Sequence, residues 1–95
     1  MHIITRKRII EAEERYPDCE TALRGWYLLM KGTDFSNFAD LRNAFNSVDK
    51  VGDLYVFNIG GNKLRLITAI HFKTAKVYIR AILTHSEYDK DNWKE

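Results

Sequence analysis

The 95-residue chain contains one cysteine, Cys19, one proline, Pro17, and no long apolar run. A single cysteine cannot form an internal disulfide, so we expect the reducing environment of the cytoplasm. Apolar runs are only a few residues long, as in 26–30. This excludes a membrane-spanning helix, and the first residues lack the apolar core of a signal peptide. His and Cys do not recur at metal-ligand spacings, so we expect neither a metal site nor a cofactor.

Acidic residues are absent from residues 54–86, which carry five Lys or Arg. Residues 1–53 carry eight Lys or Arg and nine Asp or Glu, so the net charge of +2 hides a strong asymmetry. Positive potential in this region would attract a polyanion, and RNA is the expected one. The alternative is a solvated sheet face that happens to lack acids, and charge alone does not decide between the two.

The length suits one domain, residues 1–95, with a single core. Apolar periodicity predicts a short strand at 2–4, a helix capped by Thr5 and ended by Pro17, and a second helix that Asp18 caps and Gly32 stops in a left-handed conformation. The residues expected to face the core of these helices are Ile9, Ala12, Tyr16, Leu23, Trp26, Tyr27 and Met30. A third helix is expected over 37–45 and a loop over 46–53.

Three strands are predicted over 54–59, 63–72 and 76–83, joined by tight turns. Because side chains alternate between the faces of a strand, one face is nearly all apolar and must meet the helices. That face includes Ala81 and Leu83. The residues expected on the other, open face are Val56, Asn58, Lys63, Arg65, Ile67, Ala69, His71, Lys76, Tyr78, Arg80 and Ile82. The turns place Asn58 near Arg65 and Tyr78 near His71. The predicted fold is α+β, a twisted, mainly antiparallel sheet with helices on one face.

Arg65 and Arg80 project from central strands onto the open face. Arginine offers a planar fork of donors that matches phosphate oxygens, and the strands supply no acid to pair with it. Paired surface arginines are the alternative, but we favour phosphate binding. His85 follows the last strand and titrates near neutrality, so it is a candidate acid or base. Tyr88 would reach the same place through one turn of helix and stack on a base or bind the phosphate.

Other polar residues have weaker claims. Lys63, near the turn, is a catalytic or merely electrostatic cation, and Asn58, Lys76 and Tyr78 are candidate RNA-binding residues. Asp89 either orients His85 or caps the last turn, and capping is the favoured interpretation. The remaining histidines, His2 and His71, are interpreted as structural.

This set of side chains suits RNA cleavage without a metal. The 2′-hydroxyl attacks the adjacent phosphorus after a base removes its proton, and an acid protonates the 5′-oxygen. His85 would serve one role and Tyr88 or Lys63 the other, each contributing roughly 10²–10⁴-fold. The arginines would stabilise the developing charge. The products would be a cyclic phosphate and a 5′-hydroxyl.

Four segments together resemble the HigB toxins of bacterial type II toxin–antitoxin systems. They are residues 2–7 (HIITRK), 55–65 (YVFNIGGNKLR), 78–80 (YIR) and 84–89 (THSEYD), in the order and spacing of the family. The resemblance implies a RelE-like fold, ribosome-dependent cleavage of mRNA and translation inhibition. It also implies neutralisation by a HigA-type helix-turn-helix antitoxin, so that operator DNA is bound only through the toxin–antitoxin complex. Carried over by position, the active-site residues are Lys63, Arg65, Arg80, His85 and Tyr88.

Two alternatives remain. One is a non-catalytic module that uses the same basic face to bind RNA or the ribosome. The other is a protein of toxin fold that has lost its activity and serves as the regulatory partner of a helix-turn-helix repressor.

Overall fold

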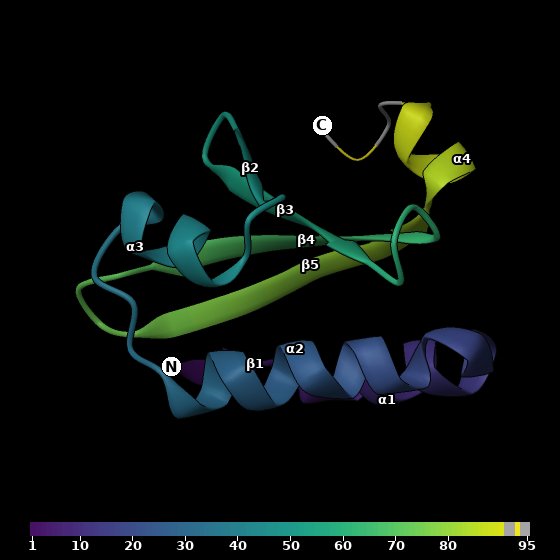
Figure 1. The fold of residues 1–95 in the computed structure, drawn as a ribbon, viewed down its shortest axis with the longest axis horizontal. Helices are drawn as coiled ribbons and strands as arrows, with labels where there is room; N and C mark the ends of the chain where they lie inside the picture. Colours follow the sequence, from purple (N-terminus) through teal and green to yellow (C-terminus); the bar gives the residue numbers. More distant parts are fainter. Residues whose placement is uncertain (91–92, 94–95) are drawn as a thin grey trace.

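The structure is a computed structural model that describes residues 1–90 and 93 (Figure 1). Within these residues, five strands form one sheet in the order β1-β5-β4-β3-β2. The strands are β1 (His2–Ile4), β2 (Asp49–Val51), β3 (Leu54–Ile59), β4 (Leu64–His71) and β5 (Lys76–Thr84). Strand β1 is parallel to β5, and the other pairs are antiparallel. The predicted α+β fold with a mainly antiparallel sheet is therefore confirmed.

Two helices pair and cover one face of the sheet (Figure 1). They are α1 (Arg6–Arg15) and α2 (Glu20–Gly32), joined by the 3-10 turn η1 (Pro17–Cys19). The predicted apolar stripe of α2 is confirmed, because Leu23, Trp26 and Met30 are buried. No helix among the described residues is both long enough and apolar enough to cross a membrane.

The helix α3 (Phe38–Ala44) closes the same core. Its cap is Asn37, whose side chain accepts a hydrogen bond from the backbone of Asp40 at 2.9 Å. The ring of Phe45 lies edge-on to Phe57 of β3, 5.0 Å away, and Phe57 also contacts Trp26 at 5.4 Å. Edge-to-face contacts between aromatic rings therefore connect α2 and the end of α3 to the sheet.

Three expectations about helix ends are wrong. Thr5 is left-handed, with φ of 75°, and its side chain caps nothing. Asp18 lies in η1 and pairs with Lys63 in place of capping α2. Gly32 is the last helical residue of α2 and does not have a positive φ. For Asp18 and for the end of α2, contacts distant in sequence replace the expected local ones.

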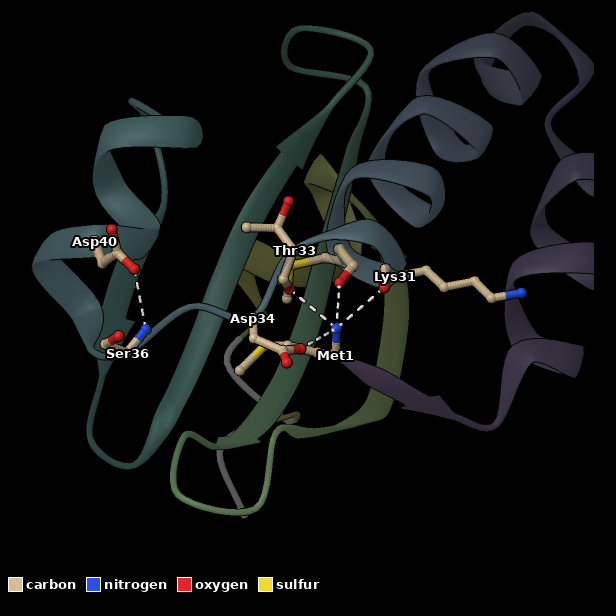
Figure 2. Close-up of polar contacts among 7 residues, drawn as sticks. Met1, Lys31, Thr33, Asp34, Ser36 and Asp40 are labelled. Atoms are coloured by element: carbon tan, nitrogen blue, oxygen red, sulfur yellow. Dashed lines mark hydrogen bonds and ion pairs between the residues drawn. The ribbon is translucent and has the colours of Figure 1, made fainter.

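The carbonyl groups at the end of α2 are satisfied by the amino group of Met1 (Figure 2). It donates to the carbonyl oxygens of Met30 at 2.9 Å, Lys31 at 3.2 Å and Thr33 at 3.0 Å. It also forms an ion pair with Asp34 at 2.9 Å. A cation at a helix C-terminus is favourable because it opposes the negative end of the helix dipole. This contact explains how α2 ends without a left-handed glycine.

The segment 46–53 was expected to be a loop, but it contains the edge strand β2. Asp49 pairs with Val56 and Val51 with Leu54. The polar composition misleads because a short edge strand exposes most of its side chains to solvent. The segment is anchored by Val48, which is buried immediately before β2.

Strand β5 contains one extra residue relative to β4. Ile67 and Thr68 of β4 face the three residues 79–81, so Arg80 forms a β-bulge. A bulge leaves one residue unpaired and reverses the alternation of faces beyond it. Residues 81–83 are all apolar, so the polar–apolar alternation of β5 stops just after Arg80, and this was the local sign of the irregularity.

Because of the bulge, the side chains at the end of β5 lie on the faces opposite to those predicted. Ile82 pairs with Leu66 and packs against the helix-covered core, although it was expected on the open face. Leu83 pairs with Arg65 on the opposite face, although it was expected in the core. The strand therefore ends with Thr84 opposite Leu64, next to Arg65.

The face expected to be open is partly covered. Val56, Arg65 and Ile67 lie on it with exposed fractions of 3 %, 8 % and 1 %. The helix α4 (His85–Asp89) lies on this side of the sheet, away from α1 and α2, and contacts β4 and β5 (Figure 1). Asn58 and His71 on the same face remain exposed.

Candidate active site

The helix α4 is fixed at the end of β5 by a capping box. The hydroxyl of Thr84 accepts a hydrogen bond from the backbone of Glu87 at 3.2 Å. The carboxylate of Glu87 in turn accepts from the backbone and hydroxyl of Thr84, both at 3.0 Å. These bonds hold the pKa of Glu87 below its ordinary value. The cap sets the first turn of α4 and so the direction of His85, the first residue of the helix.

Arg65 is a buried cation at the centre of the site. Its Nη2 donates to Nδ1 of His85 at 2.9 Å, and its Nη1 donates to the carbonyl oxygen of Leu64 at 3.3 Å. The guanidinium carbon lies 5.7 Å from the ring centroid of Tyr88, a cation–π distance. Arg65 is 8 % exposed, and within residues 1–90 and 93 none of its partners is an acid. A buried guanidinium with neutral partners retains its attraction for an anion.

Both ring nitrogens of His85 have partners. Because a guanidinium only donates, the contact with Arg65 requires a lone pair on Nδ1. The neutral ring then carries its proton on Nε2, which lies 3.4 Å from Oδ2 of Asp89. The cap at the start of α4 belongs to Thr84 and Glu87, and Asp89 is the last residue of the helix. Asp89 faces the histidine, which supports the alternative that it orients His85.

Tyr88 contacts both Arg65 and Trp93, a residue that the sequence did not point to. Its ring stacks on Trp93, with centroids 4.8 Å apart and an interplanar angle of 17°. Nε1 of Trp93 donates to the carbonyl oxygen of Tyr88 at 2.9 Å. The only available signal was a tryptophan in an otherwise charged and polar tail, 90–95. The two rings form an aromatic stack beside the buried arginine.

Lys63 lies in the turn before Arg65, but its ammonium is directed elsewhere. Nζ donates to Asp18 at 2.8 Å. This hydrogen bond and ion pair raise the pKa of Lys63 and lower the pKa of Asp18. The backbone carbonyl of Lys63 accepts from the backbone N–H of His85 at 3.3 Å. Lys63 therefore joins the turn to η1 and to the start of α4, and its ammonium is held as a cation.

The remaining candidate residues lie at increasing distance from Arg65 and His85. Asn58 pairs directly with Arg65, as predicted, and is exposed. Arg80 is exposed at the bulge. Lys76 and Tyr78 lie toward the other end of β5, where Tyr78 contacts His71 as predicted, with ring centroids 5.3 Å apart. The strand spans about 26 Å from Lys76 to its end at about 3.3 Å per residue, so Lys76 is not part of the Arg65–His85 group.

Among the described residues, acidic and imidazole groups are sparse around this site. No group of three or more His, Cys, Asp or Glu side chains suited to a metal ion occurs in residues 1–90 and 93. The groups brought together are a buried arginine, a histidine, a carboxylate and stacked aromatic rings. This arrangement suits the binding of a phosphate beside a group that can accept a proton.

Comparison with known proteins places the chain in a family. Residues 19–91 match the model of the HigB toxin family, described as the RelE-like toxic component of a toxin–antitoxin system. The chain belongs to the HigB toxin family. It is 38 % identical over 93 residues, 95 % of its length and 90 % of the relative, to the mRNA interferase HigB of Escherichia coli O6:H1. It is 39 % identical over 92 residues, 94 % of its length and 88 % of the relatives, to HigB proteins of Escherichia coli K12 and Shigella flexneri, both described as mRNA interferases.

HigB membership confirms the resemblance seen in the four sequence segments. The matched region contains β2 to β5 and α4, and hence the site residues from Asn58 to Asp89, whereas Trp93 lies just beyond it. The family is the toxic component of a toxin–antitoxin system, and membership therefore implies an antitoxin partner for this chain.

Proposed function

We propose that this HigB chain is an mRNA interferase, an endoribonuclease that cleaves mRNA on the ribosome and so inhibits translation. The observation that carries the proposal is the contact of His85 with Arg65, a buried arginine that pairs with no acid among residues 1–90 and 93. It places a proton acceptor beside a phosphate-binding cation on a segment without acidic residues. The curated relatives, which are named mRNA interferases, support the same activity.

The proposed reaction is attack by the RNA 2′-hydroxyl on the adjacent phosphorus. His85 takes the proton of the hydroxyl, the 2′-oxygen bonds to phosphorus, and the bond to the 5′-oxygen breaks. The 5′-oxygen leaves with a proton from Tyr88, giving a 2′,3′-cyclic phosphate and a 5′-hydroxyl. Tyr88 is a better proton donor here than Lys63, because the hydrogen bond with Asp18 raises the pKa of the lysine. The nucleophile belongs to the substrate, so this route requires no metal.

Charge development on the phosphate is stabilised by the arginines. Arg65 is held in place by burial and by its hydrogen bond to the carbonyl oxygen of Leu64, and fixed donors of this kind stabilise charge that develops in a transition state. Arg80, exposed at the bulge, binds a neighbouring phosphate. Asn58, opposite Arg65, contacts the RNA close to the cleaved bond. Tyr78 and Lys76 extend this binding along β5 toward its far end.

The partners of the toxin follow from the same proposal. A HigA-type helix-turn-helix antitoxin neutralises it in the cytoplasm, and operator DNA is bound only through the toxin–antitoxin complex. Co-expression of a HigA-type antitoxin that binds this chain should restore growth to cells that produce the toxin.

Expression in bacteria tests the enzyme directly. Wild type should arrest growth and cleave mRNA in a translating extract, whereas His85→Ala and Arg80→Ala should do neither. Lys73→Ala is the matched control, because Lys73 is an exposed cation in the turn at the far end of β5 and should be dispensable. Wild-type protein that binds ribosomes and leaves mRNA intact would contradict the proposal and favour a non-catalytic RNA-binding module.

A further inference from the structure

The two nitrogens of His85 contact opposite charges, and this difference assigns their roles. Nδ1 accepts from Arg65 at 2.9 Å, and Nε2 lies 3.4 Å from the carboxylate of Asp89. We propose that Asp89 is a positioning residue that holds the ring proton on Nε2 and leaves Nδ1 as the atom that accepts the proton of the 2′-hydroxyl. This inference rests on the proposed function, because it names the base and its orienting partner in the same site.

The position of Asp89 is not explained by the stability of α4. It is the last residue of the helix, where a carboxylate meets the unfavourable negative end of the helix dipole. The capping box at the other end is complete without it. Asp89 follows His85 by four residues, so the helix places both side chains on one face. Their side chains are 60 % and 55 % exposed, which leaves the pair accessible to RNA.

Arg65 and Asp89 both favour the tautomer of His85 that carries its proton on Nε2. During the reaction only Asp89 can do so. The lone pair of Nδ1 is engaged by Arg65 in the free protein. A phosphate that attracts the guanidinium releases this lone pair next to the bound RNA. Asp89 then fixes the tautomer alone. The separation of 3.4 Å exceeds that of a good hydrogen bond, and catalytic contacts of this kind shorten in the substrate complex.

Proton transfer completes the argument for Asp89. When Nδ1 takes the proton of the 2′-hydroxyl, the 2′-oxygen bonds to phosphorus and the 5′-oxygen departs with a proton from Tyr88. The imidazolium that results carries protons on both nitrogens, and the carboxylate of Asp89 stabilises it at Nε2. The same logic applies to an aspartate that orients a catalytic histidine in serine proteases.

Among residues 1–90 and 93, few charged and titratable groups face His85. Arg65 contacts it from β4, and Asp89 and Tyr88 accompany it on α4. Lys63 supplies only a backbone carbonyl, because its ammonium is paired with Asp18. Arg65, a cation, disfavours protonated His85. Loss of the Asp89 charge should therefore make the His85 imidazolium less stable.

The test compares Asp89→Asn with Asp53→Asn. Asp53 is an exposed carboxylate in the β2–β3 turn, so its replacement removes the same charge away from the site. We expect Asp89→Asn to lower kcat for mRNA cleavage by about 10²-fold, the cost of a misplaced catalytic group, with KM little changed. The acidic limb of its rate profile should move to lower pH. The ring signals of His85, followed by NMR without RNA, should titrate at lower pH in Asp89→Asn and in Asp89→Ala.

Each outcome has one meaning. A rate profile and an NMR titration that match the Asp53→Asn control would overturn the inference, even if Asp89→Asn were less active, because a structural role alone would explain that loss. An NMR shift with unchanged cleavage would also overturn it. Wild-type protein that cleaves no mRNA would overturn the proposed function itself, and the NMR titration distinguishes this failure because it needs no activity.

Discussion

Replacing Gly60 by alanine tests how the β3–β4 turn is held against η1. Gly60 and Gly61 are both left-handed, with φ of 64° and 72°. A Cβ atom at Gly60 would lie 3.0 Å from the Sγ of Cys19, whereas a Cβ at Gly61 would meet nothing within 4 Å. Alanine at either position therefore pays the cost of a left-handed backbone, but only alanine at Gly60 also clashes with Cys19.

The size of the difference follows from these contacts. A left-handed alanine costs about 1–2 kcal/mol relative to glycine, so Gly61→Ala should destabilise the protein by that amount. Gly60→Ala should lose about 1–3 kcal/mol more, the usual cost of overpacking a core. Cys19 is 1 % exposed and has little room to move away. Urea unfolding at neutral pH, with the midpoint and slope measured for each variant, checks these values.

A double-mutant cycle separates the steric part. Cys19→Ala alone leaves a cavity, but it removes the sulfur that the new methyl group would meet. The double variant Gly60→Ala/Cys19→Ala should therefore be at least about 1 kcal/mol more stable than the sum of the single changes indicates, as expected for residues in contact. Equal destabilisation by the two glycine variants, or additivity in the cycle, would refute the reasoning.

Further predictions concern the site and its support. Thr84→Val removes the hydroxyl of the capping box and should destabilise α4 by about 1 kcal/mol, measured as faster amide hydrogen exchange there; unchanged exchange would contradict the cap. Arg65→Lys keeps the charge but loses the planar fork, and should lower mRNA cleavage by about 10²-fold in a translating extract, against Lys73→Arg as the control. The pKa of Asp18 lies below its ordinary value of 3.8, so its ion pair stabilises the folded state above that pH and is lost as the pH falls through the lower, folded-state value. Stability measured from pH 6 to pH 2 should accordingly fall less in Asp18→Asn than in wild type, and equal slopes would contradict the ion pair.

Local patterns in the sequence predicted much of the core. The apolar spacing of α2 identified Leu23, Trp26 and Met30, which are all buried. Alternation along β3 and β4 predicted the pairing of Asn58 with Arg65, which is confirmed. These features depend on the periods of helices and strands, so a single sequence contains them.

The wrong predictions concern features whose partner residues are not evident from the local sequence. The bulge at Arg80 lies in the pairing of β5 with β4, beyond the residues that pair with β1, and the prediction extended the alternation through the apolar run 81–83 as if the strand were regular. The ion pair of Asp18 joins residues that are 45 positions apart, and a local rule assigned the aspartate to a helix cap. Strand β2 is short and polar, so it resembles a loop until its partner strand is known.

The candidate site was predictable in composition but not in geometry. The cations and the turn of helix after β5 indicated Arg65, His85 and Tyr88. Their arrangement depends on the bulge, which sets the end of β5 and so the direction in which α4 starts. The burial of Arg65, the stacking of Trp93 and the contact of Asp89 with His85 all follow from that arrangement.

The end groups of cleaved mRNA test the central claim most directly. Wild-type protein should be added to a translating extract and the new ends analysed by mass spectrometry. Attack by the 2′-hydroxyl predicts a 2′,3′-cyclic phosphate on one fragment and a 5′-hydroxyl on the other, both absent with His85→Ala and present with Lys73→Ala. Fragments with 5′-phosphate ends, or cleavage that persists in His85→Ala, would contradict the account.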